Sequence, residues 1–352
     1  MVPRRTGLRR QEQYRRPPEW PCEGETHRPQ RTLHKAEEKP EGRQAELGAL
    51  CHFRRKCRVR AGLFGLLRRR GAPSIRLTMP VDPQLRSLNI DIPAQPESLV
   101  KLSLLLADDQ VNLNAVSALI ASDMALASAV LKAVNSSLYG LRGRVASVQQ
   151  AITYLGTREV ASVTFEMGLR AVFPHAPELE PMWERASVRG LLMGRIGQAL
   201  GVDPWAAHSA GLFEECGKAV LFRHATERYR PMLAKAADDE ELLMLEHAEF
   251  GVSHDALGAA LCESWGLAPH AVASVRFHVI VNATRELPMQ LQRRGICALS
   301  ALSWALMTDP DSLEEVALKV APQADLDPTL VLRGARKVQE QIEAAVAREK
   351  TG

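Results

Sequence analysis

The sequence of 352 residues is short of aromatic side chains, which make up 5% of the chain, and it contains few runs of β-branched residues. Ala and Leu are frequent instead, and they favour helix over sheet. No uninterrupted apolar run approaches the roughly 20 residues that a membrane-spanning helix requires. The composition therefore predicts an all-α protein that is soluble and without a membrane span.

Cysteine pairs with the spacing of metal or redox motifs are missing as well. The six cysteines are Cys22, Cys51, Cys57, Cys216, Cys262 and Cys297, and none forms a CxxC pair. Cys51 and Cys57 flank His52, but structural zinc sites usually pair cysteines two to four residues apart and need four ligands. The last three cysteines stand among apolar neighbours, which is typical of small buried hydrophobes. These features fit a reducing cytoplasm, where we expect the protein to reside.

Acidic residues are scarce in the first 78 residues, which hold 20 Lys or Arg against 8 Glu and no Asp. The rest of the chain holds 25 basic and 33 acidic residues. The tail 1–78 lacks the apolar core of a secretion signal, and its prolines interrupt any helix, so we expect it to be disordered. Alternatively the true start is Met79, because Asp and helical periodicity first appear just after it. A native peptide spanning Arg54 to Arg70 would refute that start.

The body of the chain predicts helices with recognisable caps. From Pro96 the apolar residues recur at helical spacing, with Ser122 as a predicted cap and Ser147 with Gln150 as a capping box before a helix that stops at Gly156. A longer helix is predicted over 157–173. Two prolines, at 174 and 177, then mark a boundary between a helical subdomain at 88–173 and another at 178–307.

In the second half of the chain, caps, glycines and prolines again delimit the predicted helices. Helices are predicted over 182–200, after the cap and proline at 203–204, and over 239–250, 253–265 and 269–279. An apolar stretch covers 287–307, and a C-terminal helical extension at 311–352 contains a charged helix near 330–348. There is no strand alternation and no internal repeat.

The stretch NSSLYGLRGRVASVQQAITYLG, which begins at Asn135, resembles the HDOD family, bacterial signalling domains related to the HD phosphohydrolases. The resemblance covers about 88–306. In the first half it is carried by Asn135, Tyr139, Gly140 and Gly156. In the second half an AGL-x4-GK element contains Gly211, Gly217 and Lys218, and the elements GVSHDALGAAL, WGL and VRFH follow in the expected order.

The resemblance implies a metal site in active HD proteins, where His and Asp from separate helices hold ions that activate water. This chain departs from that pattern at several positions, and only His254 and His278 keep the expected residue. Ala186 stands where a leading His is expected, and Glu214 and Glu215 replace the His-Asp pair. Val279 stands in place of a second His, and near 296–302 only Ser300 offers an oxygen. We therefore expect vestigial metal positions, no metal, no cofactor and no catalytic residue.

The two glutamates require a separate argument, because paired carboxylates can bind cations or transfer protons. Adjacent residues in a helix point about 100° apart, so both side chains are not expected to face one pocket squarely. One of them is expected to act as a cap or to pair with Lys218, which stands four residues after Glu214. The remaining histidines, such as His208, show no ligand spacing.

The resemblance implies a non-enzymatic signal-transduction module that acts by binding a partner protein or a small ligand. The alternative is a metal-dependent phosphohydrolase or cyclic-dinucleotide phosphodiesterase that uses His254, His278, Glu214 and Glu215. Stoichiometric Mn, Fe or Zn would favour that alternative. The acidic body and the lack of a helix-turn-helix signature argue against nucleic acid as a partner, apart from tethering of nucleic acid or membrane by the basic tail. The sequence does not identify the partner or the oligomeric state.

Overall fold

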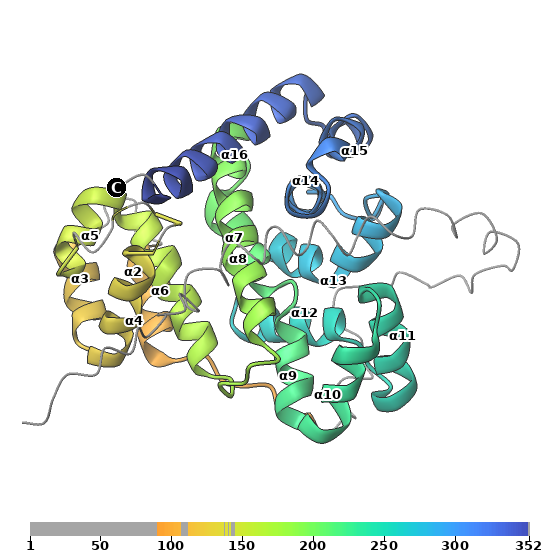
Figure 1. Cartoon of the computed structure of the whole chain (residues 1–352), viewed down its shortest axis with the longest axis horizontal. Coiled ribbons are helices and arrows are strands. Elements are labelled where there is room, and N and C mark those ends of the chain that lie inside the picture. Colours follow the sequence, from red (N-terminus) through yellow and green to blue (C-terminus); the bar gives the residue numbers. More distant parts are fainter. Residues whose placement is uncertain (1–89, 107–111, 137, 140, 142–144, 351–352) are drawn as a thin grey trace, which may run out of the picture. The chain divides into compact units, whose positions relative to one another are not determined.

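The computed structural model describes residues 90–106, 112–136, 138–139, 141 and 145–350. Within these ranges every regular element is a helix (Figure 1), so the prediction of an all-α fold is confirmed. The predicted disordered tail 1–78, the proposed start at Met79 and the motif residue Gly140 lie outside the described residues.

The first group of helices consists of α2 (Glu97–Leu106), α3 (Leu113–Ala121), α4 (Met124–Val134), α5 (Val148–Leu155) and α6 (Thr157–Ala171). Their apolar positions face inward, and Leu99, Val116 and Val130 are completely buried. α6 packs against α4 and α5, while α2 and α5 both contact α3. Among the described helices none is by itself long and apolar enough to cross a membrane. Only α3 and α4 taken together reach that length and apolarity, and they are bent by 112°.

The helix caps of this group correct one expectation and support another. Asp123, and not Ser122, caps α4, because its carboxylate accepts a hydrogen bond of 3.0 Å from the Leu126 N–H. Ser122 instead ends α3. The Ser147 hydroxyl accepts from the Gln150 N–H at 3.2 Å, as predicted for α5. The Gln150 side chain completes the cap by accepting from the backbone N–H of Ala146.

The second group follows a loop that contains the two predicted boundary prolines. Its helices are α7 (Glu180–Leu200), α8 (Pro204–Phe213), α9 (Cys216–His224), α10 (Thr226–Lys235), α11 (Asp239–Phe250), α12 (His254–Ser264), α13 (Pro269–Thr284) and α14 (Gly295–Thr308). α7 runs along α8, and α12 lies between α9 and α13 (Figure 1). The predicted helix over 269–279 is too short, since α13 continues to Thr284, and α10 was not predicted.

Aromatic packing joins the two groups. The Phe165 ring of α6 lies 5.4 Å from the Trp205 ring of α8 and 6.2 Å from the Trp265 ring that ends α12, measured between centroids. An ion pair of 3.0 Å between Glu159 of α6 and Arg195 of α7 adds to this contact. The division into subdomains at 88–173 and 178–307 stays a prediction.

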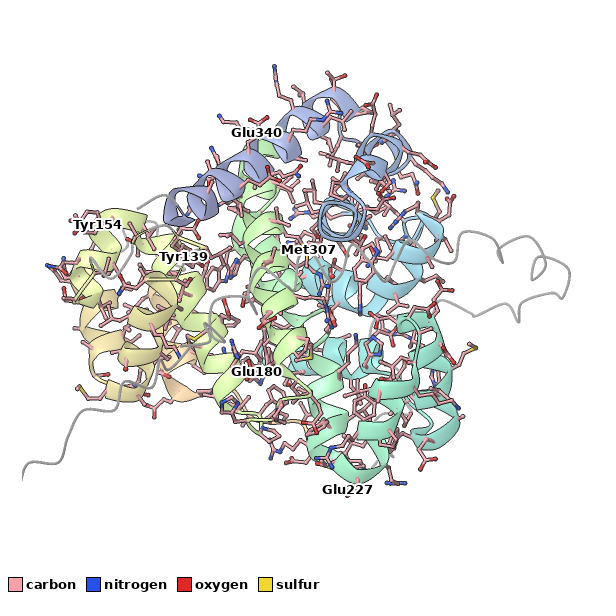
Figure 2. The ribbon with its side chains drawn as sticks, in the orientation of Figure 1. Tyr139, Tyr154, Glu180, Glu227, Met307 and Glu340 are labelled. Atoms are coloured by element: carbon pink, nitrogen blue, oxygen red, sulfur yellow. The ribbon has the colours of Figure 1, made fainter. Side chains whose placement is uncertain are left out.

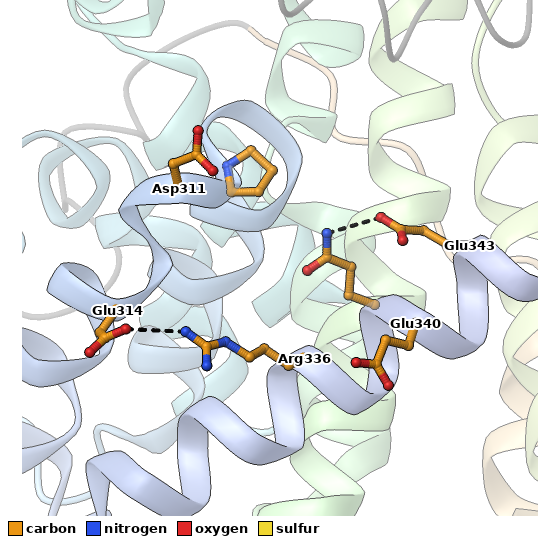
Figure 3. Close-up of a pocket in the computed structure, with 7 residues that line it drawn as sticks. Asp311, Glu314, Arg336, Glu340 and Glu343 are labelled. Carbon is orange, nitrogen blue, oxygen red and sulfur yellow. Dashed lines mark hydrogen bonds and ion pairs between the residues drawn. The ribbon is translucent and has the colours of Figure 1, made fainter.

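The C-terminal part adds η3 (Pro310–Ser312), α15 (Leu313–Val320), η4 (Pro322–Ala324) and α16 (Pro328–Lys350), and α16 packs on α7. Figure 3 shows an acidic groove between η3 and α16. One ion pair crosses it, with 3.1 Å between Arg336 and Glu314, and both side chains are more than half exposed. The groove shares no residue with the predicted site.

Two glycines allow helices of the second group to approach unusually closely. A Cβ on Gly211 of α8 would lie 2.8 Å from the Cα of Gly190 on α7. A Cβ on Gly217 of α9 would lie 1.9 Å from the backbone oxygen of His254, at the start of α12. Backbone atoms cannot yield as a flexible side chain can, so Gly217 sets the distance between α9 and α12.

We expect Gly217→Ala to lower the free energy of unfolding by about 1–3 kcal/mol or more, because α9 and α12 must separate to admit the methyl group. The matched control is Gly334→Ala in α16. Its new Cβ would meet its nearest neighbour at 3.6 Å, an ordinary contact. That control should gain up to about 1 kcal/mol of helix propensity. Urea unfolding measures both variants, and equal stability of the two would contradict the role of Gly217.

Candidate functional site

The acidic pair Glu214 and Glu215 lies at a break between α8 and α9, and both side chains are buried. The geometry of a continuous helix therefore does not apply, and the expectation that the two carboxylates diverge is wrong. Both contact the guanidinium of Arg189, which projects from α7. Its Nε lies 3.2 Å from Glu214 Oε2, and its Nη2 lies 2.7 Å from Glu215 Oε1.

Three cations surround the Glu215 carboxylate. Arg189 and Arg185, one turn apart on α7, both donate to it, and the Lys218 ammonium lies 2.8 Å from Oε2. Burial opposes ionisation, but Arg185, Lys218 and Arg189 together hold the pKa of Glu215 well below its ordinary value. One of the two glutamates does pair with Lys218, as expected, but it is Glu215 at i,i+3 and not Glu214 at i,i+4.

Glu214 has a different electrostatic environment. Burial raises the pKa of its carboxyl group to about 7, although Arg189 and the nearby Ser300 hydroxyl favour the ionised form. Its oxygens find no well-aligned hydrogen-bond donor among the described residues. Arg189 also contacts an aromatic ring: its guanidinium carbon lies 5.8 Å from the ring centroid of Trp304.

Lys218 connects the acidic pair to a second cluster. Its ammonium also lies 2.7 Å from Oδ1 of Asp239, the first residue of α11. Burial opposes ionisation of Asp239, yet Lys218 lowers the pKa of this carboxyl group to about 2. The Asp239 side chain is 23% exposed, in contrast to the buried glutamates.

The two predicted histidines lie beside Asp239, and both are buried. His254 Nδ1 lies 2.8 Å from Glu246 Oε2, which also accepts the His254 backbone N–H at 2.7 Å. His278 Nδ1 lies 2.7 Å from the Val275 carbonyl oxygen. Burial and the nearby His254 lower the pKa of His278 to about 4. For His254 burial acts in the same direction, but the Glu246 carboxylate outweighs it and raises the pKa.

One potential ligand atom from each of Asp239, His254 and His278 lies within 4.8 Å of the others. The structure thus brings together both predicted histidines with a carboxylate that sequence reasoning missed. The sequence reasoning also missed Arg185, Arg189 and Glu246. The four-residue spacing of the two arginines, which places them on one face of α7, was a usable signal, whereas nothing in the sequence places Asp239 beside residues so distant in the chain.

The remaining predicted positions contribute no ligand. Ala186 is buried on α7 between the two arginines, and Val279 is buried on α13. The family's paired metals would require the positions of Glu214 and Glu215. Arg185, Arg189 and Lys218 already neutralise Glu215, and the guanidinium of Arg189 lies 3.2 Å from Glu214, so the residues at this position do not fit a metal ion.

The family motif residues have structural roles that position the site. The Asn135 amide donates to the carbonyls of Leu131 and Val145 and accepts from the Val145 N–H, which fastens the segment after α4. Tyr139 lies beside α7 (Figure 2), where burial raises the pKa of its hydroxyl. Gly156 joins α5 to α6 at a φ of 87°, a conformation that favours glycine.

The raised pKa of Glu214 predicts a pH-dependent stability. Below pH 4.5, its ordinary pKa, the Glu214 carboxyl group is protonated in both the folded and the unfolded protein. Its titration then does not lower the free energy of unfolding. Its ionisation destabilises the folded protein increasingly between pH 4.5 and about 7, by at most about 1.4 kcal/mol per pH unit. Glu214→Gln should remove this component, as urea unfolding at several pH values will show. Glu315→Gln, at an exposed position, should leave the pH profile unchanged, and identical profiles for all three proteins would contradict the assignment.

Comparison with known proteins agrees with this architecture. The HDOD domain family matches residues 92–281. A curated protein of Treponema pallidum (strain Nichols), described as uncharacterized, is 28% identical over 196 residues, which are 53% of this chain and 37% of that protein. The chain therefore matches little more than a third of that relative's length.

Two solved structures share the fold at low sequence identity. One, from Shewanella amazonensis, is provisionally named a phosphohydrolase. It has a TM-score of 0.56 and 17% identity, with 75% of this chain and 96% of that one covered. The other, from Marinobacter aquaeolei, is provisionally named a signal transduction protein. It has a TM-score of 0.55 and 20% identity, with 76% and 65% covered. Together with a family match over more than half of its length, the helical architecture shows that this chain belongs to the HDOD domain family.

Proposed function

We propose that the chain is a non-catalytic regulatory module that acts by binding a protein partner or a small ligand. One observation carries the proposal. The guanidinium of Arg189 lies between Glu214 and Glu215, where an active relative would hold metal ions. Arg185 and Lys218 complete the neutralisation of Glu215.

The electrostatics support this interpretation. A guanidinium cannot be deprotonated in a protein, so Arg189 remains a fixed positive charge at every accessible pH. A divalent ion at the acidic pair would have to displace this group or accept its repulsion at close range. Because Arg189 is completely buried, it has no alternative position in solvent. A structure in which cations of the chain satisfy the carboxylates can be retained for binding without supporting hydrolysis.

The name of the Marinobacter relative agrees with a signalling role, and that of the Shewanella relative with the alternative, a metal-dependent phosphohydrolase or cyclic-dinucleotide phosphodiesterase. The observation that favours the alternative is the cluster of Asp239, His254 and His278. This cluster could hold metal whether or not the protein is an enzyme. Metal content alone therefore does not separate the two functions, and turnover must be measured.

We expect the purified protein to hydrolyse neither bis(p-nitrophenyl) phosphate nor a cyclic dinucleotide when Mn²⁺, Fe²⁺ or Zn²⁺ is supplied. The matched control is the double variant His254→Ala/His278→Ala, which removes both imidazoles, with its folding checked by circular dichroism. Equal background rates for the two proteins support the proposal. Metal-dependent turnover that the double variant loses would establish the alternative.

The binding role has a separate test. Affinity capture from the native host, followed by mass spectrometry of retained proteins and small molecules, should recover a specific species at a stoichiometric level. Gly217→Ala, which disturbs the packing of α9 on α12, should retain less of it. If nothing is retained above the level of an unrelated helical protein, the chain does not act by stable binding.

A further inference from the structure

Two imidazole nitrogens in the second helical group are buried without a partner. The side chains of His254 and His278 are 0% and 1% exposed, and their rings lie 5.5 Å apart between centroids. Each Nδ1 contacts an oxygen, whereas neither Nε2 has a hydrogen-bond partner in the part of the chain that the structure describes. An unpaired buried polar atom normally costs free energy, so two such nitrogens side by side would be stabilised by a ligand that binds both.

The contacts at Nδ1 determine what these nitrogens can bind. The Val275 carbonyl can only accept a hydrogen bond, so His278 carries its proton on Nδ1 and presents a lone pair at Nε2. The Glu246 carboxylate orients His254 in the same way. Histidine ligands of metal ions usually donate the other ring N–H to a carboxylate or a backbone carbonyl. Both rings already have this arrangement.

Asp239 supplies a third ligand from a different helix. One ligand atom from each of Asp239, His254 and His278 lies within 4.8 Å of the other two. Lys218 contacts Oδ1 of Asp239, so we assign Oδ2 to an ion. The Asp239 side chain is 23% exposed, so the cluster borders solvent at this residue.

We propose that Asp239, His254 and His278 form a mononuclear site for a divalent transition-metal ion of the Zn²⁺ type. Two imidazoles and one carboxylate suit such an ion, whereas Ca²⁺ and Mg²⁺ prefer oxygen ligands. The site does not use Glu214 or Glu215. The positive charge of Lys218, which contacts Asp239, opposes the binding of a second cation, so we expect a single ion.

The ion would connect the first residue of α11 to α12 and α13, and it would thereby stabilise the packing of three helices. This inference goes beyond the proposed function, because such an ion requires no hydrolysis. The two fail separately: turnover would overturn the proposed function while leaving the site intact, and the absence of binding would overturn the site without restoring catalysis.

The test uses the full chain, stripped with a chelator and titrated with Zn²⁺ by calorimetry, with the melting temperature measured in parallel. We expect one ion bound at the site and a rise in melting temperature. Asp239→Asn and His278→Gln should each weaken binding at least about tenfold and abolish the rise. The matched control is His208→Gln, because His208 is also a buried histidine with an unpaired Nε2 but lies on α8. It should bind as the unchanged protein does.

Titration with Co²⁺ identifies the ligands, because cysteine thiolates in the tail would add a thiolate-to-cobalt charge-transfer band that the proposed site lacks. The visible spectrum of bound Co²⁺ should change in Asp239→Asn and persist in His208→Gln. Two results would overturn the proposal: no change in melting temperature with Zn²⁺, or binding that Asp239→Asn and His278→Gln both leave unaltered.

Discussion

The ion cluster around Glu215 is the interaction on which the arrangement of the site depends. Burying an isolated carboxylate or guanidinium is expensive, and removing one member of a buried ion pair typically costs about 3–5 kcal/mol. Arg189 and Glu215 are both almost completely buried, so neither can be accommodated without the other. The cluster therefore constrains α7 and α9 to one relative position. Through Lys218 it extends the constraint to the start of α11.

Close helix packing makes this cluster possible. The side chain of Arg189 reaches both glutamates because α7 and α8 touch at Gly190 and Gly211. Lys218 lies next to the beginning of α12 because Gly217 admits the His254 carbonyl against its Cα. The glycines that the family resemblance singles out thus act on the site indirectly, by fixing distances between helices. Their conformational freedom matters less here than their lack of a Cβ.

Much of the fold could be predicted from local patterns. The Asp203 cap, the helix over 239–250 and its end at Gly251 follow from residues adjacent in the sequence, and the structure confirms them. The site was predicted only in part. His254 and His278 were found from the resemblance, but Arg189 and Glu215 are 26 residues apart and Lys218 and Asp239 are 21 apart. Such pairs depend on helix packing, for which a single sequence carries no local signal.

The break between α8 and α9 explains both the wrong expectation for the acidic pair and the separation of the two clusters. No proline or glycine occupies positions 214 and 215, so nothing local revealed it. Because of the break, Glu214 and Glu215 turn toward the cations of α7, while Lys218, one turn later, turns toward Asp239. An ion at Oδ2 of Asp239 would share this carboxylate with Lys218, which contacts Oδ1 of Asp239 and also Oε2 of Glu215. The binding of an ion at Asp239 would consequently change the electrostatic environment of Glu215, because the Lys218 ammonium contacts both carboxylates.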